Sequence, residues 1–164
     1  MTWSLLLVSK LRTKIMMEIR KWFSKQTSSE TSIAPLVVFR ILFGSMMFLS
    51  TLRFISKGWV TDLYITPNYF FTYLGFDWIK PLDEFGIYFL FGAILISSLL
   101  IALGLFYRLG AIVFFTAFTY IELLDKTNYL NHYYFISLVA FLMMFLPANK
   151  KCALDVYFGF IGQK

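Results

Sequence analysis

The sequence predicts an all-α integral membrane protein, a bundle of about four transmembrane helices with an N-terminal amphipathic helix and an aromatic non-cytoplasmic loop. Of its 164 residues, 59% are hydrophobic and only 15% are charged, whereas soluble domains average roughly 45–50% and about 25%. A soluble domain of this length cannot enclose 20 Phe and 10 Tyr, because its surface-to-volume ratio is too high. Four apolar segments of suitable length for a bilayer complete the prediction.

The first domain, residues 1–34, is predicted to be a basic amphipathic arm followed by a linker. Charged residues recur at helical spacing on one face and apolar residues on another. This pattern is typical of a helix lying in the headgroup layer of an anionic leaflet. A loose N-terminal extension is the alternative. Residues 26–32 are polar, and Thr31 or Ser32 is expected to cap the next helix before Pro35. The net charge of +6 comes mostly from this arm, so we expect a lipid bilayer as partner and no nucleic acid.

The second domain, residues 35–157, contains the four apolar segments and leaves 158–164 as a tail. The segments span 35–55, 85–106, 109–124 and 132–147, and the second of them holds no acidic or basic residue. The last two are short for a bilayer core of about 30 Å, so flanking Tyr and Asn residues are expected at the interface. Open strand edges are excluded from hydrocarbon, so these segments are predicted to be helices.

Lys and Arg are concentrated in the N-terminal arm, the turn near Arg108 and the tail. The positive-inside rule therefore predicts a multi-pass protein with both termini in the cytoplasm. The connections 56–84 and 125–132 then share the opposite, non-cytoplasmic side of the membrane. The first of these is rich in aromatic residues, and we expect it to lie on the membrane surface or to fold back over the helix ends as a cap. Short loops and composition favour a bacterial inner (plasma) membrane.

The candidate catalytic residues are Asp125, Lys126, Asn131 and His132, which form a polar group between two apolar segments. Glu122 and Lys126 have the i,i+4 spacing of a helical ion pair. Asp125 and His132 are seven residues apart and would share a face if the helix continued. Such a group can hold a carbonyl, carboxylate or quinol oxygen, and a histidine there can carry a proton near neutral pH. The alternative is a polar turn with interfacial capping residues.

Two further residues admit more than one interpretation. Arg40 lies about five residues into the first segment, where it either faces the bundle interior or extends its guanidinium to the interface. Cys152 cannot form an intrachain disulfide because it is the single cysteine. Cys152 is either a small side chain at the membrane boundary or a thiol that is lipidated or reactive. With one His and one Cys, no Cys/His metal set is available and no metal is expected, and no phosphate-binding loop or nucleophile elbow occurs.

The segment LLDKTNYLNHYYFISLVAFLMMFLPANK (123–150) resembles the signature of the vitamin K-dependent γ-glutamyl carboxylase family. The membrane part of that family is the horizontally transferred transmembrane (HTTM) domain. FRILFGSMMF (39–48) resembles the first helix of the family, YLGFDWIKPL (73–82) its aromatic loop, and LGLFYRLGAI (103–112) its turn between helices. The resemblance covers about residues 35–157.

This resemblance implies a lyase reaction in which oxygen oxidises vitamin K hydroquinone to its epoxide, and the strong base so formed removes a γ-proton from a peptide glutamate that then adds CO₂. It places Asp125, Lys126, Asn131 and His132 in or beside the active site. His132 matches the histidine that the family uses in the carboxylation half of the reaction. The implied cofactor is vitamin K hydroquinone, a lipid-soluble molecule that can enter from the bilayer, and an aromatic lid would shield the reaction from water.

The sequence departs from the family pattern after the fourth segment. Family members continue with further helices and a large domain, and the lysine that deprotonates the hydroquinone lies in that later region. Lys126 belongs to a different motif. We therefore expect only the N-terminal part of the family architecture here, a fragment or a short paralogue, completed for catalysis by a second chain or the missing C-terminal half. The alternative is a non-catalytic helical scaffold or partner subunit. A transporter-like bundle is disfavoured because no inverted repeat is visible.

Overall fold

The computed structural model describes residues 14, 16–18, 33–76, 78–128, 130–150 and 152–159. The chain divides into two units, Met1–Ser32 and Ile33–Lys164. In the first unit the described residues are helical and exposed, and the remainder of the predicted amphipathic helix lies outside the described residues.

All of the regular secondary structure in the described part of the second unit is helical, with no strand. Its elements are α2 (Ala34–Ser56), the π-helix η1 (Thr61–Ile65), α3 (Glu84–Leu103), α4 (Tyr107–Leu124), the 3₁₀ helix η2 (Lys126–Asn128), α5 (Asn131–Phe145) and α6 (Leu154–Tyr157). Helices α2, α3 and α4 are long and apolar enough to cross a bilayer, and α5 is a shorter apolar helix of 15 residues. At 1.5 Å per residue α5 is about 22 Å long. The predicted helical membrane bundle is confirmed.

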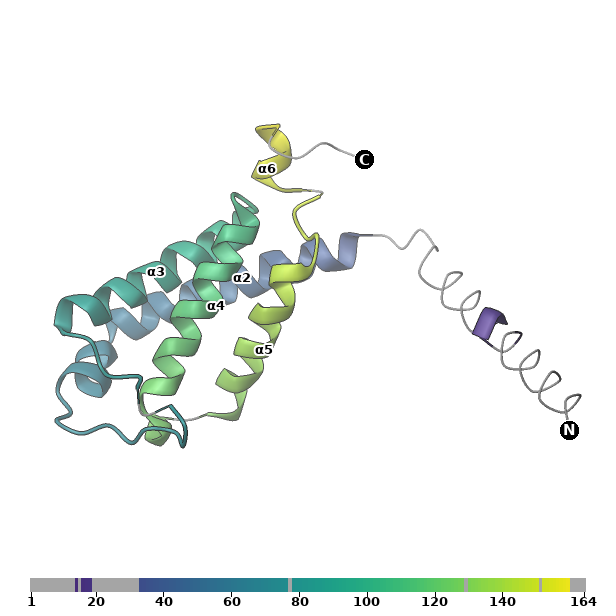
Figure 1. Ribbon diagram of the computed structural model, residues 1–164. Helices are drawn as coiled ribbons and strands as arrows, with labels where there is room; N and C mark the ends of the chain where they lie inside the picture. Colours follow the sequence, from purple (N-terminus) through teal and green to yellow (C-terminus); the bar gives the residue numbers. More distant parts are fainter. Residues whose placement is uncertain are drawn as a thin grey trace, which may run out of the picture. The chain divides into compact units, whose positions relative to one another are not determined.

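Each long helix packs against the next one in the chain: α2 against α3, α3 against α4, and α4 against α5 (Figure 1). Residues 104–106 make the turn from α3 to α4 at one end of the bundle. At the other end the long connection 57–83 and the short connection 125–130 are joined, because the Lys126 amide donates to the Phe71 carbonyl at 2.9 Å. The two connections therefore share an end, as predicted.

Local sequence explains where the helices begin and end. The Asp83 carboxylate accepts from the Gly86 amide at 3.2 Å and caps α3. Gly104, at φ +66°, ends α3 in the left-handed conformation that glycine adopts without strain. Pro35 lies in the first turn of α2 as predicted, but the cap is Ile33, which makes no side-chain bond. The predicted caps, Thr31 and Ser32, lie outside the described residues.

Close packing of α2 on α3 depends on Gly44. A Cβ atom at this position would lie 2.5 Å from the Ala102 nitrogen and 2.8 Å from the Ser98 carbonyl oxygen, both in the α3 backbone. Small residues let transmembrane helices approach in this way. Large apolar side chains such as Leu42 and Phe89 project outward from the bundle, which is the arrangement expected of a surface in contact with lipid tails.

The long connection folds back over the helix ends, so the second of its two predicted arrangements is the observed one. Val60 and Ile79 are buried against the bundle. The Tyr120 hydroxyl of α4 donates to the Lys80 carbonyl at 2.7 Å and holds the end of the connection. Leu74 and Trp78 remain exposed on its outer side, where aromatic and apolar side chains suit a membrane interface.

Candidate functional site

Asp125 ties the two connections together. It is buried, and its Oδ1 accepts from the Thr127 amide at 2.9 Å and from the Phe71 amide at 3.3 Å. The Lys126 amide returns a bond to the Phe71 carbonyl. A carboxylate with backbone donors from both connections fixes their relative positions. Asp125 thus has a positioning role that the sequence alone did not reveal.

Lys126, Asn131 and His132 are exposed. His132 lies in the first turn of α5 with its ring edge-on to Tyr133, the ring centroids being 4.5 Å apart. Within the described residues, no hydrogen bond or ion pair joins these three side chains to each other or to Asp125. The structure therefore gathers the four predicted site residues at one end of the bundle but does not link them directly. Their catalytic role stays a prediction.

The predicted ion pair between Glu122 and Lys126 is not formed among the described residues. Helix α4 ends at Leu124, and Asp125 is extended at φ −146° and ψ 114°. The i,i+4 rule holds only within a continuous helix, so Lys126 no longer lies one turn beyond Glu122. For the same reason the spacing of seven between Asp125 and His132 does not place them on one helical face.

Glu122 lines a small inner cavity of about 50 Å³ between the helices. Its other polar walls are Ser50, Thr51, Tyr64 and Tyr133. Burial, followed by the nearby Glu122 carboxylate, raises the pKa of Tyr64. The Tyr64 phenol therefore keeps its proton and can donate into the cavity. Such a volume is sufficient for a water molecule with polar partners.

Glu122 also lines a larger groove of about 460 Å³ between α4 and α5. Tyr73 and Phe76 of the long connection cover one end of the groove, and Phe115 and Phe141 contribute apolar walls. This volume lies within the range of roughly 300–1,000 Å³ that small-molecule sites occupy. An apolar groove closed by aromatic residues and ending at a carboxylate suits a flat, lipid-soluble molecule with polar substituents.

Thr119 adds a second polar group to this groove. Its Oγ1 atom is buried and has no hydrogen-bond partner among the described residues. By contrast, the exposed Thr116 one turn earlier donates back to the Ile112 and Val113 carbonyls at 2.9 and 3.1 Å. A buried hydroxyl without a partner costs free energy unless a ligand or water satisfies it. Sequence reasoning missed Thr119 because a threonine in an apolar helix is an ordinary residue.

Arg40 belongs to a polar network at the opposite end of the bundle. Its side chain is fully buried, so it faces the interior and does not extend to the interface. Nη1 donates to the Ile101 carbonyl at 3.1 Å and Nη2 to the Cys152 carbonyl at 2.6 Å. These bonds fasten the segment after α5 to the end of α3.

Asp155 completes this network and was not predicted. Its carboxylate accepts from the Phe106 amide at 2.7 Å, the Tyr107 amide at 3.2 Å and the Asn149 side chain at 2.8 Å. It therefore caps α4 from a distant part of the chain. The sequence signal that could have found it is a pair of polar residues, Asn149 and Asp155, beyond the last apolar segment.

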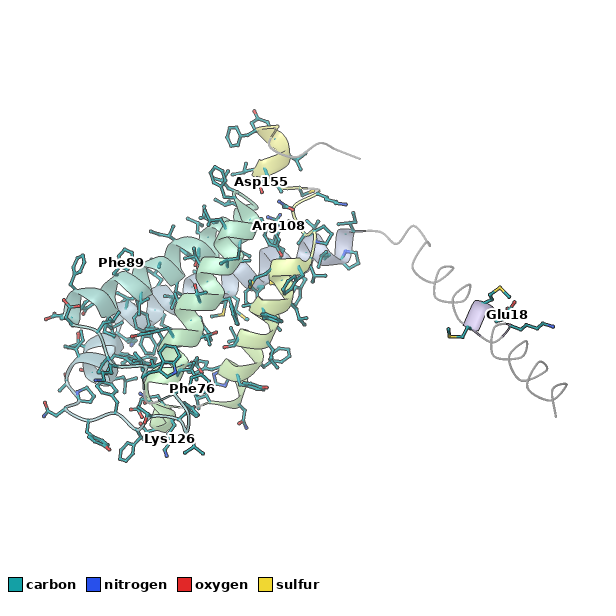
Figure 2. The ribbon with its side chains drawn as sticks, in the orientation of Figure 1. Glu18, Phe76, Phe89, Arg108, Lys126 and Asp155 are labelled. Atoms are coloured by element: carbon teal, nitrogen blue, oxygen red, sulfur yellow. The ribbon has the colours of Figure 1, made fainter. Side chains whose placement is uncertain are left out.

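The two polar regions lie at opposite ends of the bundle, with Phe76 and Lys126 at one end and Arg108 and Asp155 at the other (Figure 2). The family model of the HTTM domain matches residues 29–161, which include both ends and all of the helices described above. The chain belongs to the HTTM domain family. The match contains the whole of the 35–157 domain predicted from the sequence, and no solved structure matches the chain significantly. In this HTTM domain, the α4–α5 groove and the connection 125–130 form the candidate site.

Proposed function

We propose that this HTTM domain binds a lipid-soluble quinol in the α4–α5 groove and acts in peptidyl-glutamate γ-carboxylation coupled to vitamin K hydroquinone oxidation. The observation that carries the proposal is the groove itself. It is almost entirely apolar, has a volume of about 460 Å³, and has Thr119 and Glu122 among its polar residues. A naphthoquinol likewise combines an apolar ring system and tail with hydroxyl groups at defined positions.

The residues of the groove fit both parts of the hydroquinone, its hydroxyl groups and its apolar rings and tail. The buried Thr119 hydroxyl lacks a partner among the described residues, and a quinol hydroxyl would satisfy it. The Glu122 carboxylate can accept a hydrogen bond from the quinol. Phe115, Leu138 and Phe141 provide apolar contact for the rings and tail. Tyr73 and Phe76 of the long connection exclude water from that end of the groove.

When bound, the hydroquinone would react with oxygen as the oxidant and so give the strong base that the family reaction needs. The chain's own residues would position the other reactant. His132 is exposed in the first turn of α5, two residues before Tyr134 of the groove wall, and is suited to hold a proton or a hydrogen bond to the peptide glutamate. Lys126, exposed in the neighbouring connection, would attract the glutamate carboxylate. Asp125 would keep both connections in register through its backbone bonds.

Binding can be tested without turnover. The full chain in phosphatidylcholine nanodiscs is exposed to tritium-labelled vitamin K hydroquinone under anaerobic conditions, and retained label is compared with that of empty nanodiscs. Replacing Thr119 with valine keeps the shape and removes the hydroxyl, so we expect about tenfold weaker binding, since a hydrogen bond to a buried group contributes about 1–1.5 kcal/mol. Thr116→Val is the matched control on the same helix and should bind like the unmodified chain.

The alternative function is a non-catalytic scaffold or partner subunit. It is favoured by α5, in which only Ala140 and Met143 are buried, so most of the helix is available to lipid or to another protein. Absence of saturable hydroquinone binding, with the chain folded, would reject the quinol proposal and favour this alternative. Equal binding by Thr119→Val and Thr116→Val would place the quinol elsewhere.

A further inference from the structure

A second cavity of about 390 Å³ lies at the end of the bundle remote from the proposed quinol groove. It is bounded by the first residues of α4 and by the connection between α5 and α6. Arg108 and Lys150 line it, and both are exposed. Neither forms an ion pair among the described residues. The cavity is therefore open to solvent or lipid headgroups and holds two available cations.

The acidic group in the wall of this cavity does not neutralise those cations. Asp155 is buried and already accepts three hydrogen bonds, two from backbone amides and one from Asn149. It also interacts electrostatically with the buried guanidinium of Arg40. The Asp155 charge is thus largely compensated inside the protein, and the outer part of the cavity is electropositive. Two such side chains around one cavity suit a phosphate group.

An apolar groove lies beside this cavity on the outside of the bundle. It has a volume of about 360 Å³, lies between α3 and α4, and shares Leu109 with the cationic cavity. Gly92 and Ala93 of α3 and Gly110 of α4 are among its walls, and the groove is open there because these residues are small. Phe89 and Ile96 flank it and are exposed. A polar, cationic cavity next to an apolar groove matches the outline of a phospholipid.

We propose that Arg108 and Lys150 bind the phosphodiester of an anionic phospholipid, with one acyl chain in the α3–α4 groove. Anionic headgroups are favoured over zwitterionic ones because the two cations have no other counter-ion in the described part of the chain. Lys and Arg next to the membrane each contribute about fivefold to the affinity for anionic lipid. The positive-inside prediction places this end at the cytoplasmic leaflet, where anionic lipids are concentrated.

Native mass spectrometry of the full chain released from nanodiscs can count the retained lipids. The nanodiscs contain phosphatidylcholine with a minority of phosphatidylglycerol. We expect preferential retention of phosphatidylglycerol by the unmodified chain, about fivefold weaker retention for Arg108→Gln or Lys150→Gln, and about 25-fold for the double variant. Lys57→Gln is the matched control, because Lys57 is exposed just after α2 and outside both cavities.

The groove is tested separately with Gly92→Leu. A Cβ atom at Gly92 has no heavy atom within 4 Å, so the leucine fills the groove without displacing the backbone. We expect this variant to retain less phosphatidylglycerol. Inorganic phosphate should stabilise it against unfolding as much as it stabilises the unmodified chain. If Gly92→Leu has no effect and inorganic phosphate competes for the cations, the occupant is a free anion and the lipid proposal fails. Equal losses in Lys57→Gln and Arg108→Gln would mean that general surface charge, and no defined cavity, attracts the lipid.

Discussion

Replacing Gly44 with alanine should destabilise the bundle, although alanine is the better helix former. In a helix interior the substitution gains about 1 kcal/mol of intrinsic propensity. At Gly44 the new Cβ would lie 2.5 Å from the Ala102 nitrogen. Non-bonded heavy atoms prefer about 3.5–4.0 Å, so α2 and α3 must separate by about 1 Å where they cross. The atoms that the new Cβ meets belong to the α3 backbone, so a side-chain rotation cannot relieve the contact.

We therefore expect the upper end of the usual overpacking cost, about 3 kcal/mol, and a net destabilisation of about 2 kcal/mol by Gly44→Ala. Gly92→Ala is the matched control, because its Cβ meets open space. This variant should gain about 0.5–1 kcal/mol. Unfolding of the two variants by sodium dodecyl sulfate in mixed micelles, followed by circular dichroism and tryptophan fluorescence, measures the difference. Free energies of unfolding that agree within about 0.5 kcal/mol would refute the close α2–α3 contact as the reason for Gly44.

Three further substitutions and one labelling experiment test other parts of the structure. Asp155→Asn should lower the free energy of unfolding by about 2 kcal/mol, because charge-assisted bonds to two amides are weakened; unfolding in mixed micelles measures it. His132→Ala should lower ¹⁴CO₂ incorporation in a completed, active protein far more than its expression, and equal activity would leave the residue a capping group. Burial raises the pKa of the Tyr64 phenol in the folded protein. The stability that depends on the neutral phenol is therefore complete below the unfolded pKa of about 10 and is lost as the pH rises above it. Tyr64→Phe should remove this loss of stability at alkaline pH. Cysteines at Asn68 and Asn128 should react with an impermeant reagent from the non-cytoplasmic side, and protection of both would invert the predicted orientation.

Hydropathy was sufficient to predict the helices because lipid leaves the backbone no other way to satisfy its polar groups. The prediction for α2, residues 35–55, agrees with Ala34–Ser56 within one residue at each end. The second segment was predicted to reach residue 106, whereas α3 ends at Leu103. Apolar composition continues through the turn, but Gly104 takes a left-handed conformation that ends the helix there.

The polar sites were less predictable, because they depend on contacts between distant parts of the chain. The spacing argument for Glu122, Lys126 and His132 assumed a continuous helix, and the extended conformation at Asp125 breaks that periodicity. Asp125 itself finds its partner 54 residues away, at the Phe71 amide. Glu122 was assigned an ion-pair partner, but it lines two cavities whose other walls come from several helices. The periodicity of a sequence does not show which residues of other helices will line a cavity.

The two interpretations of Arg40 show the same limit from another direction. Its position in the segment allowed an interior or an interfacial guanidinium, and the sequence around it did not decide. The acceptors that hold it inside are carbonyls of Ile101 and Cys152, 61 and 112 residues further along the chain. Backbone carbonyls are present at every residue, so no side-chain motif signals their availability.

The cap that Asp155 places on α4 has a consequence for biogenesis. A ribosome makes the first turn of α4 long before it reaches Asp155, which lies 48 residues beyond Tyr107. During that interval the Phe106 and Tyr107 amides must rely on headgroups or water. The turn between α3 and α4 therefore gains its Asp155 acceptor only after α5 has been synthesised. A chain that stopped before Asp155 would lack these acceptors, so the first turn of α4 is capped only once α6 is present.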